Sequence, residues 1–237
     1  MKNEALSAET GSFLRWLAGW RDGLAWRPAG EIFAEPDRTA VMSVDLIKGF
    51  CYEGPLSSPR VASIVPAVVS LFEHAYDAGV RRFMLFQDTH DEDAAEFGSF
   101  GPHCVSGSTE SETIEELSAL PFSSLFEIVP KNSLSPSIGT GLDGWLEANA
   151  GVDRFVVVGD CTDLCIYQLA MHLRLSANAA GIERSVIVPA DCVDTYDMPV
   201  GPAGELGVMP HDGDLLHALF LYHMALNGIE VASGITG

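Results

Sequence analysis

Hydrophobic residues follow two patterns along this chain: short unbroken apolar runs, and longer segments with an apolar residue every three or four positions. Unbroken runs rich in Val, Ile and Phe are typical of strands that are buried on both faces of a sheet. The runs that we predict to be strands are 40–45, 82–88, 125–131, 154–159, 185–191 and 229–233.

Segments with helical periodicity lie between these runs. They span residues 61–78, 111–119, 141–150, 163–180 and 214–227. Gly79, Gly181 and Gly228 directly follow three of them, and glycine commonly ends helices. Strands that alternate with helices predict right-handed crossovers and a parallel sheet that is covered on both faces. We therefore predict a three-layer α/β/α domain with a central, mainly parallel, Rossmann-like sheet.

The beginning of the chain has a different character. Phe13, Trp16 and Trp20 recur at helical spacing among polar residues, which predicts an amphipathic helix. Its apolar face would pack on the rest of the chain or on a second subunit, and we expect a homo-oligomer. We predict a helical extension over residues 1–35 that is packed on one domain over residues 36–237.

Charge and cysteine content narrow the class of protein. The chain has 33 acidic and 13 basic residues and a formal net charge of −20, which disfavours binding to nucleic acid or to an anionic membrane surface. No apolar run is long enough for a membrane-spanning helix, and no signal peptide is recognisable. Five cysteines, an odd number, favour reduced thiols over a disulfide framework. We expect a cytoplasmic protein that acts on a small molecule.

Polar residues follow the predicted strands at the points where they end. Asp45, Asp88 and Lys131 end the first three strands, and the fourth leads through a short turn to Cys165 at a helix start. Because the carboxyl ends of parallel strands form the ligand crevice of such sheets, these residues are candidates for chemistry. Each of them taken singly is as well explained by capping, solvation or burial.

Taken together, three of these residues fit a nucleophile and its helpers. A thiol in the first turn of a helix is favoured as thiolate, and the free N–H groups there can hold an oxyanion. Asp45 would accept the thiol proton of Cys165, since no His ends a neighbouring strand. Lys131 would pair with both groups and lower the pKa of the thiol.

A second cluster of candidate residues follows the second predicted strand. Asp88 and His90 are two positions apart and point to the same side of an extended chain, while His103 returns after a Gly- and Pro-containing loop. One carboxylate and two imidazoles suit a divalent metal, with zinc as the first choice and iron or manganese as alternatives. Glu96 is the preferred fourth ligand, although three other acids lie nearby: Asp91, Glu92 and Asp93.

The ordered segments VDLIKGF, QDTH, FGPHCVSGS, KNS and GDCTDLC resemble those of the nicotinamidase and isochorismatase-like cysteine hydrolase family. The resemblance implies a catalytic triad of Asp45, Lys131 and Cys165, and a divalent metal held by the residues of the second cluster. It also implies a cis peptide bond from Asp160 to Cys161, with the N–H groups of Cys161 and Cys165 forming an oxyanion hole. The expected activity is release of ammonia from a small amide such as nicotinamide through a cysteine thioester.

Two departures from the family pattern lie where the resemblance places the substrate. Phe50 and Phe100 would line the slot for an aromatic ring, but residues 46–49 differ from the usual nicotinamidase motif, and nicotinamidases tend to have Trp in place of Phe100. The alternatives are therefore hydrolysis of a carbamoyl or ureido compound, or a metal-binding module without turnover.

The remaining cysteines and histidines receive no functional role. Cys51, Cys104 and Cys192 are interpreted as structural thiols. His172, His217 and His223 fall within predicted helices, where a satisfied histidine is the usual finding. His211 precedes two acids at a helix start, and we attribute it to capping and solvation.

Overall fold

A parallel sheet runs through the centre of the protein, whose structure is a computed structural model that describes residues 2–237. Its strand order is β4-β3-β2-β5-β6-β8, and the short β7 pairs with the end of β5. Every strand pair in it is parallel. The strands are β2 (Thr39–Val44), β3 (Phe83–Asp88), β4 (Phe126–Lys131), β5 (Arg154–Asp160), β6 (Ser185–Pro189), β7 (Val193–Asp194) and β8 (Glu230–Ala232).

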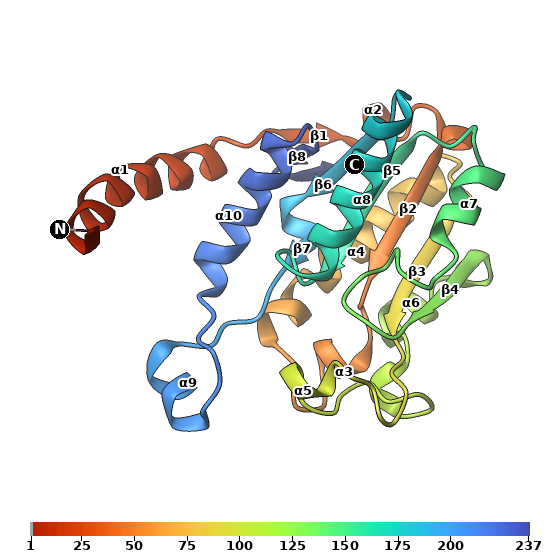
Figure 1. Cartoon of the computed structure of the whole chain (residues 1–237). Coiled ribbons are helices and arrows are strands. Elements are labelled where there is room, and N and C mark those ends of the chain that lie inside the picture. The colour runs from red at the N-terminus through yellow and green to blue at the C-terminus, as the bar shows by residue number, and fades with distance from the viewer. Residues whose placement is uncertain (1) are drawn as a thin grey trace.

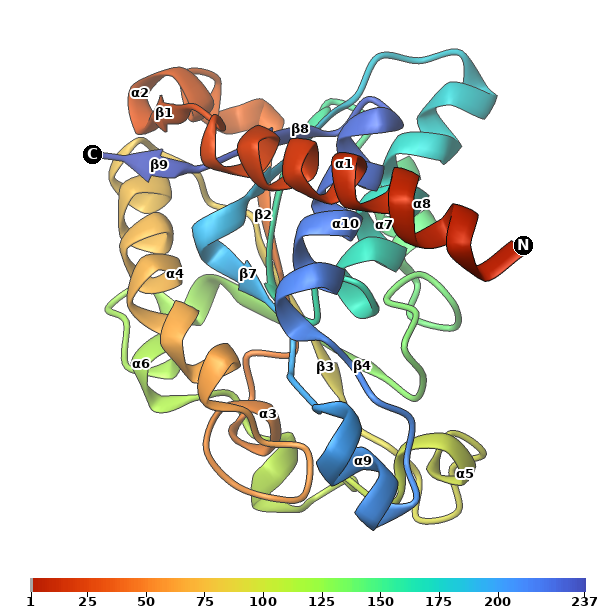
Figure 2. The same ribbon diagram turned by 90° about the vertical axis from the view of Figure 1, so that its left-hand side faces the viewer.

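Helices cover both faces of this sheet. One layer contains the long α4 (Pro59–Asp77) and the short α2 (Ala29–Ile32), α3 (Lys48–Cys51) and α6 (Glu115–Ser118). The other contains α7 (Leu142–Ala148), α8 (Cys165–Ala180) and α10 (Gly213–Leu226). Alternate residues of β5 face opposite layers, since Val156 packs with α4 and Val157 packs with α8. The predicted three-layer α/β/α fold is confirmed, and Figure 2 shows the two helical layers on either side of the sheet.

The two central strands come unusually close at their carboxyl ends. β2 and β5 pair from Thr39 and Arg154 to Val44 and Gly159. Gly159 has a φ of 115°, and a Cβ there would lie 2.0 Å from the carbonyl oxygen of Val44. Only glycine permits this approach, which brings the residues after β2 next to the turn after β5. The candidate site forms at this edge of the sheet.

Several short elements were not predicted or differ from the prediction. The helix expected over 111–119 is reduced to α6, and the strand expected over 185–191 ends at Pro189. Short elements depend on tertiary contacts rather than on a sequence period, which explains why the pattern missed them. Besides α3 and β7, they include α5 (Phe97–Phe100), α9 (Val200–Leu206), the parallel pair β1 (Trp26–Pro28) and β9 (Gly234–Thr236), and 3₁₀ turns at Pro36–Arg38, Thr109–Ser111, Ser123–Leu125 and Ala190–Cys192.

The first helix, α1 (Lys2–Asp22), crosses α10, and its N-terminal part extends away from the rest of the chain, as Figures 1 and 2 show. Phe13, Trp16 and Trp20 surround Tyr222 of α10 with ring centroids 5.6, 5.3 and 5.8 Å from it. The predicted aromatic face therefore packs on the chain's own domain, although Trp16 stays 51% exposed. No helix among residues 2–237 has the length and apolar character that crossing a membrane requires.

Candidate active site

Lys131 brings the three predicted catalytic side chains together at the carboxyl edge of the sheet. Its Nζ lies 2.8 Å from Asp45 Oδ2 and 3.6 Å from Cys165 Sγ. The side chains come from the ends of β2 and β4 and from the start of α8, so the neighbouring strands position them. All three are buried, with at most 3% of any residue exposed. The ammonium group can therefore interact with the carboxylate and the thiol in surroundings from which water is largely excluded.

Asp88 links this group to the second cluster. Its Oδ1 accepts a hydrogen bond from Lys131 Nζ at 2.6 Å, and its backbone N–H donates to Asp45 Oδ1 at 2.8 Å. Burial favours the neutral form of Asp88, but Lys131 and the two imidazoles outweigh it and hold its pKa well below the usual value. Asp88 is therefore ionised at neutral pH.

Asp45 and Lys131 respond to the same surroundings in different ways. Burial, and after it the charge of Asp88, raises the pKa of Asp45 to about 6, although Lys131 opposes the shift. Burial alone would lower the pKa of Lys131, but Asp45, Cys165 and Asp88 raise it well above its usual value. A buried ammonium thus stays charged beside a carboxyl group that can exchange a proton near neutral pH.

Cys165 is the first residue of α8 and lies directly after the turn that follows β5. The expected stabilisation of its thiolate is wrong for the resting protein: burial raises the pKa of Cys165 well above its usual value, and Lys131 offsets this only in part. The thiol consequently needs a base, and the group on the other side of Lys131 is Asp45. The Asp160–Cys161 peptide bond is cis, as the resemblance implies.

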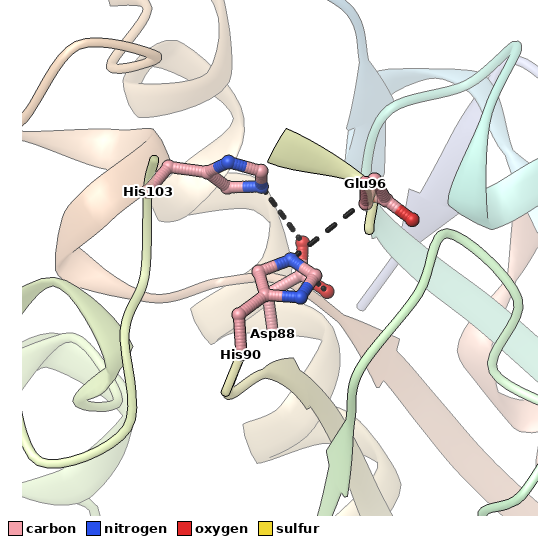
Figure 3. A group of neighbouring side chains, drawn as sticks. All are labelled: Asp88, His90, Glu96 and His103. Atoms are coloured by element: carbon pink, nitrogen blue, oxygen red, sulfur yellow. Dashed lines mark ion pairs between the residues drawn. The ribbon is translucent and has the colours of Figure 1, made fainter. Parts of the chain in front are cut away.

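The second cluster also assembles, as Figure 3 shows, with Asp88, His90, Glu96 and His103 pointing toward one another. One nitrogen or oxygen atom from each residue lies within 4.8 Å of those of the other three. His90 Nε2 is 3.4 Å and His103 Nε2 is 3.7 Å from the Asp88 carboxylate, and His90 Nε2 is 4.0 Å from Glu96 Oε1. Asp91 instead accepts a hydrogen bond from Asn132 outside this group.

The outer contacts of these residues fit a metal ion. His90 Nδ1 lies 3.0 Å from Asn132 Oδ1, and His103 Nδ1 lies 2.8 Å from the carbonyl oxygen of Gly101. Both acceptors favour a proton on Nδ1, so each ring would bind a metal through the lone pair of Nε2, the nitrogen that faces the cluster. His90 Nε2 and Glu96 Oε1 are buried without a hydrogen-bond partner within residues 2–237, which suits atoms that bind a metal.

Aromatic rings surround the two imidazoles. Phe50, which is 9% exposed, meets His103 with ring centroids 5.8 Å apart. Phe97, which the sequence analysis did not single out, contacts both His90 and His103 at 5.3 and 5.6 Å. Phe100 is half-buried at the end of the same short helix, α5. Phe97 is thus the ring of α5 in contact with the imidazoles, and its place beside Glu96 in the sequence was the available signal.

Two histidines, His217 and His211, contact the turn after β5, and the role of one of them was underestimated. His217 Nδ1 lies 2.9 Å from Thr162 Oγ1, which agrees with its interpretation as a satisfied buried residue. The interpretation of His211 as a solvated capping residue is wrong. It is 8% exposed and its Nε2 lies 2.8 Å from Asp163 Oδ2, while Asp212 caps α10 instead. This contact spans 48 positions of the chain, so no local pattern could reveal it.

Comparison with known proteins adds independent findings. Residues 39–205 match the family model of the isochorismatase domain. The chain is 26% identical over 212 residues to nicotinamidase 1 of Arabidopsis thaliana, which covers 81% of this chain and 84% of that protein. Its fold is similar to that of a pyrazinamidase of Pyrococcus horikoshii in complex with zinc (TM-score 0.63, 21% identity, 82% and 98% of the two chains). It is also similar to that of an N-carbamoylsarcosine amidase from Thermoplasma acidophilum (TM-score 0.61, 24% identity, 84% and 99%).

Proposed function

The chain belongs to the isochorismatase family and is a hydrolase of non-peptide carbon–nitrogen bonds, and on that premise we propose that it releases ammonia from a small amide through a thioester on Cys165. The observation that carries the proposal is the contact of one buried ammonium, Lys131, with both the Cys165 thiol and the Asp45 carboxylate. Nucleophile, base and cation are thereby held in one water-poor site.

The reaction begins with transfer of the Cys165 thiol proton to Asp45 as the sulfur attacks the amide carbon. A carbon–sulfur bond forms, and the carbonyl oxygen becomes an oxyanion. We assign its stabilisation to the N–H groups of Cys161 and Cys165, which within residues 2–237 donate to no backbone carbonyl. Asp45 then gives its proton to the amide nitrogen, the carbon–nitrogen bond breaks, and ammonia leaves.

Hydrolysis of the thioester completes the cycle. Asp45, again ionised, removes a proton from water as the water oxygen attacks the thioester carbon. The carbon–sulfur bond breaks, the acid product is released, and the sulfur recovers its proton. Lys131 stays charged throughout, because its pKa is raised well above its usual value, and it compensates whichever neighbour is anionic.

Asp88, His90, His103 and Glu96 would hold a divalent metal beside this triad, and zinc suits their donor atoms best. When bound, the metal supplies a Lewis acid that orients the substrate. Phe50 and Phe97 contact the imidazoles and present flat apolar surfaces next to the metal position. This arrangement favours an aromatic amide such as nicotinamide as the substrate. We also propose that the protein is a homo-oligomer and that it acts in the cytoplasm.

A carbamoyl or ureido compound is the second candidate substrate. Residues 46–49 depart from the nicotinamidase motif, and the fold is similar to that of an N-carbamoylsarcosine amidase. A panel that measures ammonia release from nicotinamide, pyrazinamide and carbamoyl amino acids separates the two candidates. If no compound in the panel released ammonia, a metal-binding module without turnover would be favoured.

Replacement of the nucleophile tests the mechanism. We expect Cys165→Ser to keep the fold but lose nearly all turnover, because a hydroxyl is a far weaker nucleophile than a thiolate here. Cys192→Ser, the same change at another buried thiol, is the matched control and should keep activity. Mass spectrometry should find an acyl group on Cys165 when a slow substrate is quenched. If Cys165→Ser retained more than about a tenth of the activity, a barrier change below about 1.4 kcal/mol, covalent catalysis would be wrong.

A further inference from the structure

The turn between β5 and α8, residues 160–165, contacts residues from the C-terminal part of the chain. Thr162 donates its backbone N–H to the carbonyl oxygen of Asp194 at 2.9 Å, and its hydroxyl contacts His217 Nδ1 at 2.9 Å. The next residue, Asp163, contacts His211 Nε2 at 2.8 Å. These contacts lie one and two residues after the first proposed oxyanion donor and just before the proposed nucleophile. They are therefore placed to set the geometry of both.

The two hydrogen-bond partners of His211 favour its protonated form. Nδ1 lies 2.9 Å from the carbonyl oxygen of Tyr196, and Nε2 faces the carboxylate of Asp163. Both partners can only accept, so two hydrogen bonds require a proton on each ring nitrogen, which makes the ring an imidazolium. The ring also stacks on Tyr196, with centroids 3.8 Å apart and planes 19° apart. These contacts together hold the orientation of the ring.

Asp163 depends on this cation. Only 5% of its side chain is exposed, and among residues 10–237, whose side chains the structure describes, His211 is the one cationic side chain in ion-pair contact with it. A buried carboxylate that loses its cation is strongly destabilised, so the turn would rearrange to expose or protonate it. Cys165 lies two residues further on and would move with the turn.

His211 also joins the turn to a loop. The backbones of Met198 and His211 exchange hydrogen bonds of 2.7 and 2.8 Å, which close the loop that contains α9. Figures 1 and 2 place α9 at the same end of the protein as α3 and α5, where the candidate site lies. The imidazolium thus stands at the base of this loop and in contact with the turn of the nucleophile.

We propose that His211 is a positioning residue for the reaction: its imidazolium, bonded to Asp163, holds the turn that presents Cys165 and the oxyanion donors. This inference rests on the proposed function, because it assumes that Cys165 is the nucleophile. Neither His211 nor Asp163 contacts the reacting atoms, and His211 acts only through the turn.

The charge of His211 gives the proposal a pH dependence. Burial alone would lower the pKa of His211, but Asp163 first and Asp197 after it raise the pKa above its usual value; Tyr196 stacks on the remaining side. The ion pair is therefore complete below about pH 6.5, the usual value, and is lost as the pH rises through the raised pKa of the folded state. Lys131 does not titrate in the same range, since its pKa is raised well above 10.5.

The experiment compares His211→Gln with His172→Gln. His172 is the matched control, because it pairs with Asp143 at 2.6 Å and lies on α8, the helix that begins at Cys165, but does not touch the turn. We expect His211→Gln to lower kcat by about 10- to 100-fold, the range for displaced reacting groups, with much less effect on KM. We also expect the kcat of the wild type to decline at alkaline pH as His211 loses its charge, and this decline should be absent in His211→Gln. The control should keep both the wild-type kcat and the decline.

Two further measurements separate the possible failures. The rate at which iodoacetamide alkylates Cys165, followed by mass spectrometry, reports on the turn without any turnover; it should change in His211→Gln and not in the control. If Cys165→Ser proved active, the proposed function would be wrong. The alkylation rate would still show whether His211 holds the turn that presents Cys165. If His211→Gln does not fold, a double variant, Asp163→Asn with His211→Gln, leaves no unpaired charge at this contact; it should fold and show low kcat without the alkaline decline. A folded His211 variant with kcat within about twofold of wild type, too small a barrier change to matter here, and an unchanged alkylation rate would overturn the proposal.

Discussion

Lys131 determines the behaviour of the site at the scale of single residues. One ammonium contacts two carboxylates, Asp45 and Asp88, in surroundings where water cannot compensate an excess of negative charge. Asp88 is further stabilised as an anion by two imidazoles, whereas Asp45 is not. The two carboxylates therefore divide their roles: Asp88 keeps its charge, and Asp45 is the one that can take up a proton.

This division predicts the acid side of the pH profile. The pKa of Asp45 is raised to about 6, so lowering the pH through that value protonates Asp45 and removes the base. We expect kcat/KM, measured with saturating metal, to fall below about pH 6. Asp45→Asn should lose about 10²- to 10⁴-fold in rate, since an amide cannot accept the thiol proton. Its residual activity should not show this decline.

Asp45→Glu is the control for assigning the acid decline of kcat/KM to Asp45. It keeps a carboxylate on a longer side chain, so it should keep an acid decline at a shifted pH while losing rate through altered geometry. An acid decline that stays unchanged in Asp45→Asn would assign it to another group and remove Asp45 from the role of base.

The residues that the sequence revealed and those it hid differ in a physical way. Asp45, Lys131 and Cys165 could be found because parallel strands bring their carboxyl ends to one edge, so a position in each strand becomes a position in space. His211 could not, because its contacts depend on how loops fold back on the sheet, and the one signal for Phe97 was its place beside Glu96 in the sequence. The acids that follow His211 in the sequence even favoured the wrong interpretation.

At the scale of elements, the long buried strands and helices were predicted to within a few residues. Their hydrophobic periods are long enough to be distinctive, as in β5 and α4. The pair β1 and β9 is different, because each strand has three residues and its partner lies at the other end of the chain. Such pairing is decided by tertiary contact and leaves no sequence period.

The four metal-binding candidates come from the segment between the end of β3 and His103, which includes α5, and this segment yields the second prediction. We expect His103→Ala to lose its divalent metal, since no neighbouring residue replaces the missing lone pair. Asn132→Ala should weaken metal affinity by about 10- to 100-fold, because Asn132 only orients His90. Elemental analysis after dialysis against graded chelator measures both.

His223→Ala is the matched control for the metal prediction, because His223 is an exposed histidine of α10 outside the cluster. It should retain the metal content of the wild type. Equal metal content in His103→Ala and wild type would show that the cluster does not hold the metal. The proposed role of Phe50 and Phe97 beside a metal-bound substrate would then be wrong.

At the scale of the whole molecule, α1 is set apart from the rest. It contacts α10, and it lies outside residues 39–205, which match the family model. Three aromatic rings of α1 surround Tyr222 of α10, and Leu17 of α1 is also buried, with 2% of its surface exposed. The candidate site forms at the carboxyl edge of the sheet from residues that α1 does not supply. Stability and catalysis should therefore respond separately to changes in α1.

The last prediction tests this separation by deleting residues 2–22, which leaves β1 and its pairing with β9 in place. We expect kcat/KM within about twofold of the full chain, and a free energy of unfolding lower by about 1–3 kcal/mol from the lost aromatic packing. For a chain of this size each kcal/mol corresponds to a fall in Tm of about 2–4 °C.

Tyr222→Ala in the full chain should give part of the same loss of stability. The same substitution in the shortened chain should add little, because the aromatic partners of Tyr222 are already gone. Differential scanning calorimetry of the four proteins measures this coupling. Full additivity of the two changes would show that α1 is not held by Tyr222, and a large loss of activity on deletion would show that α1 supports the site.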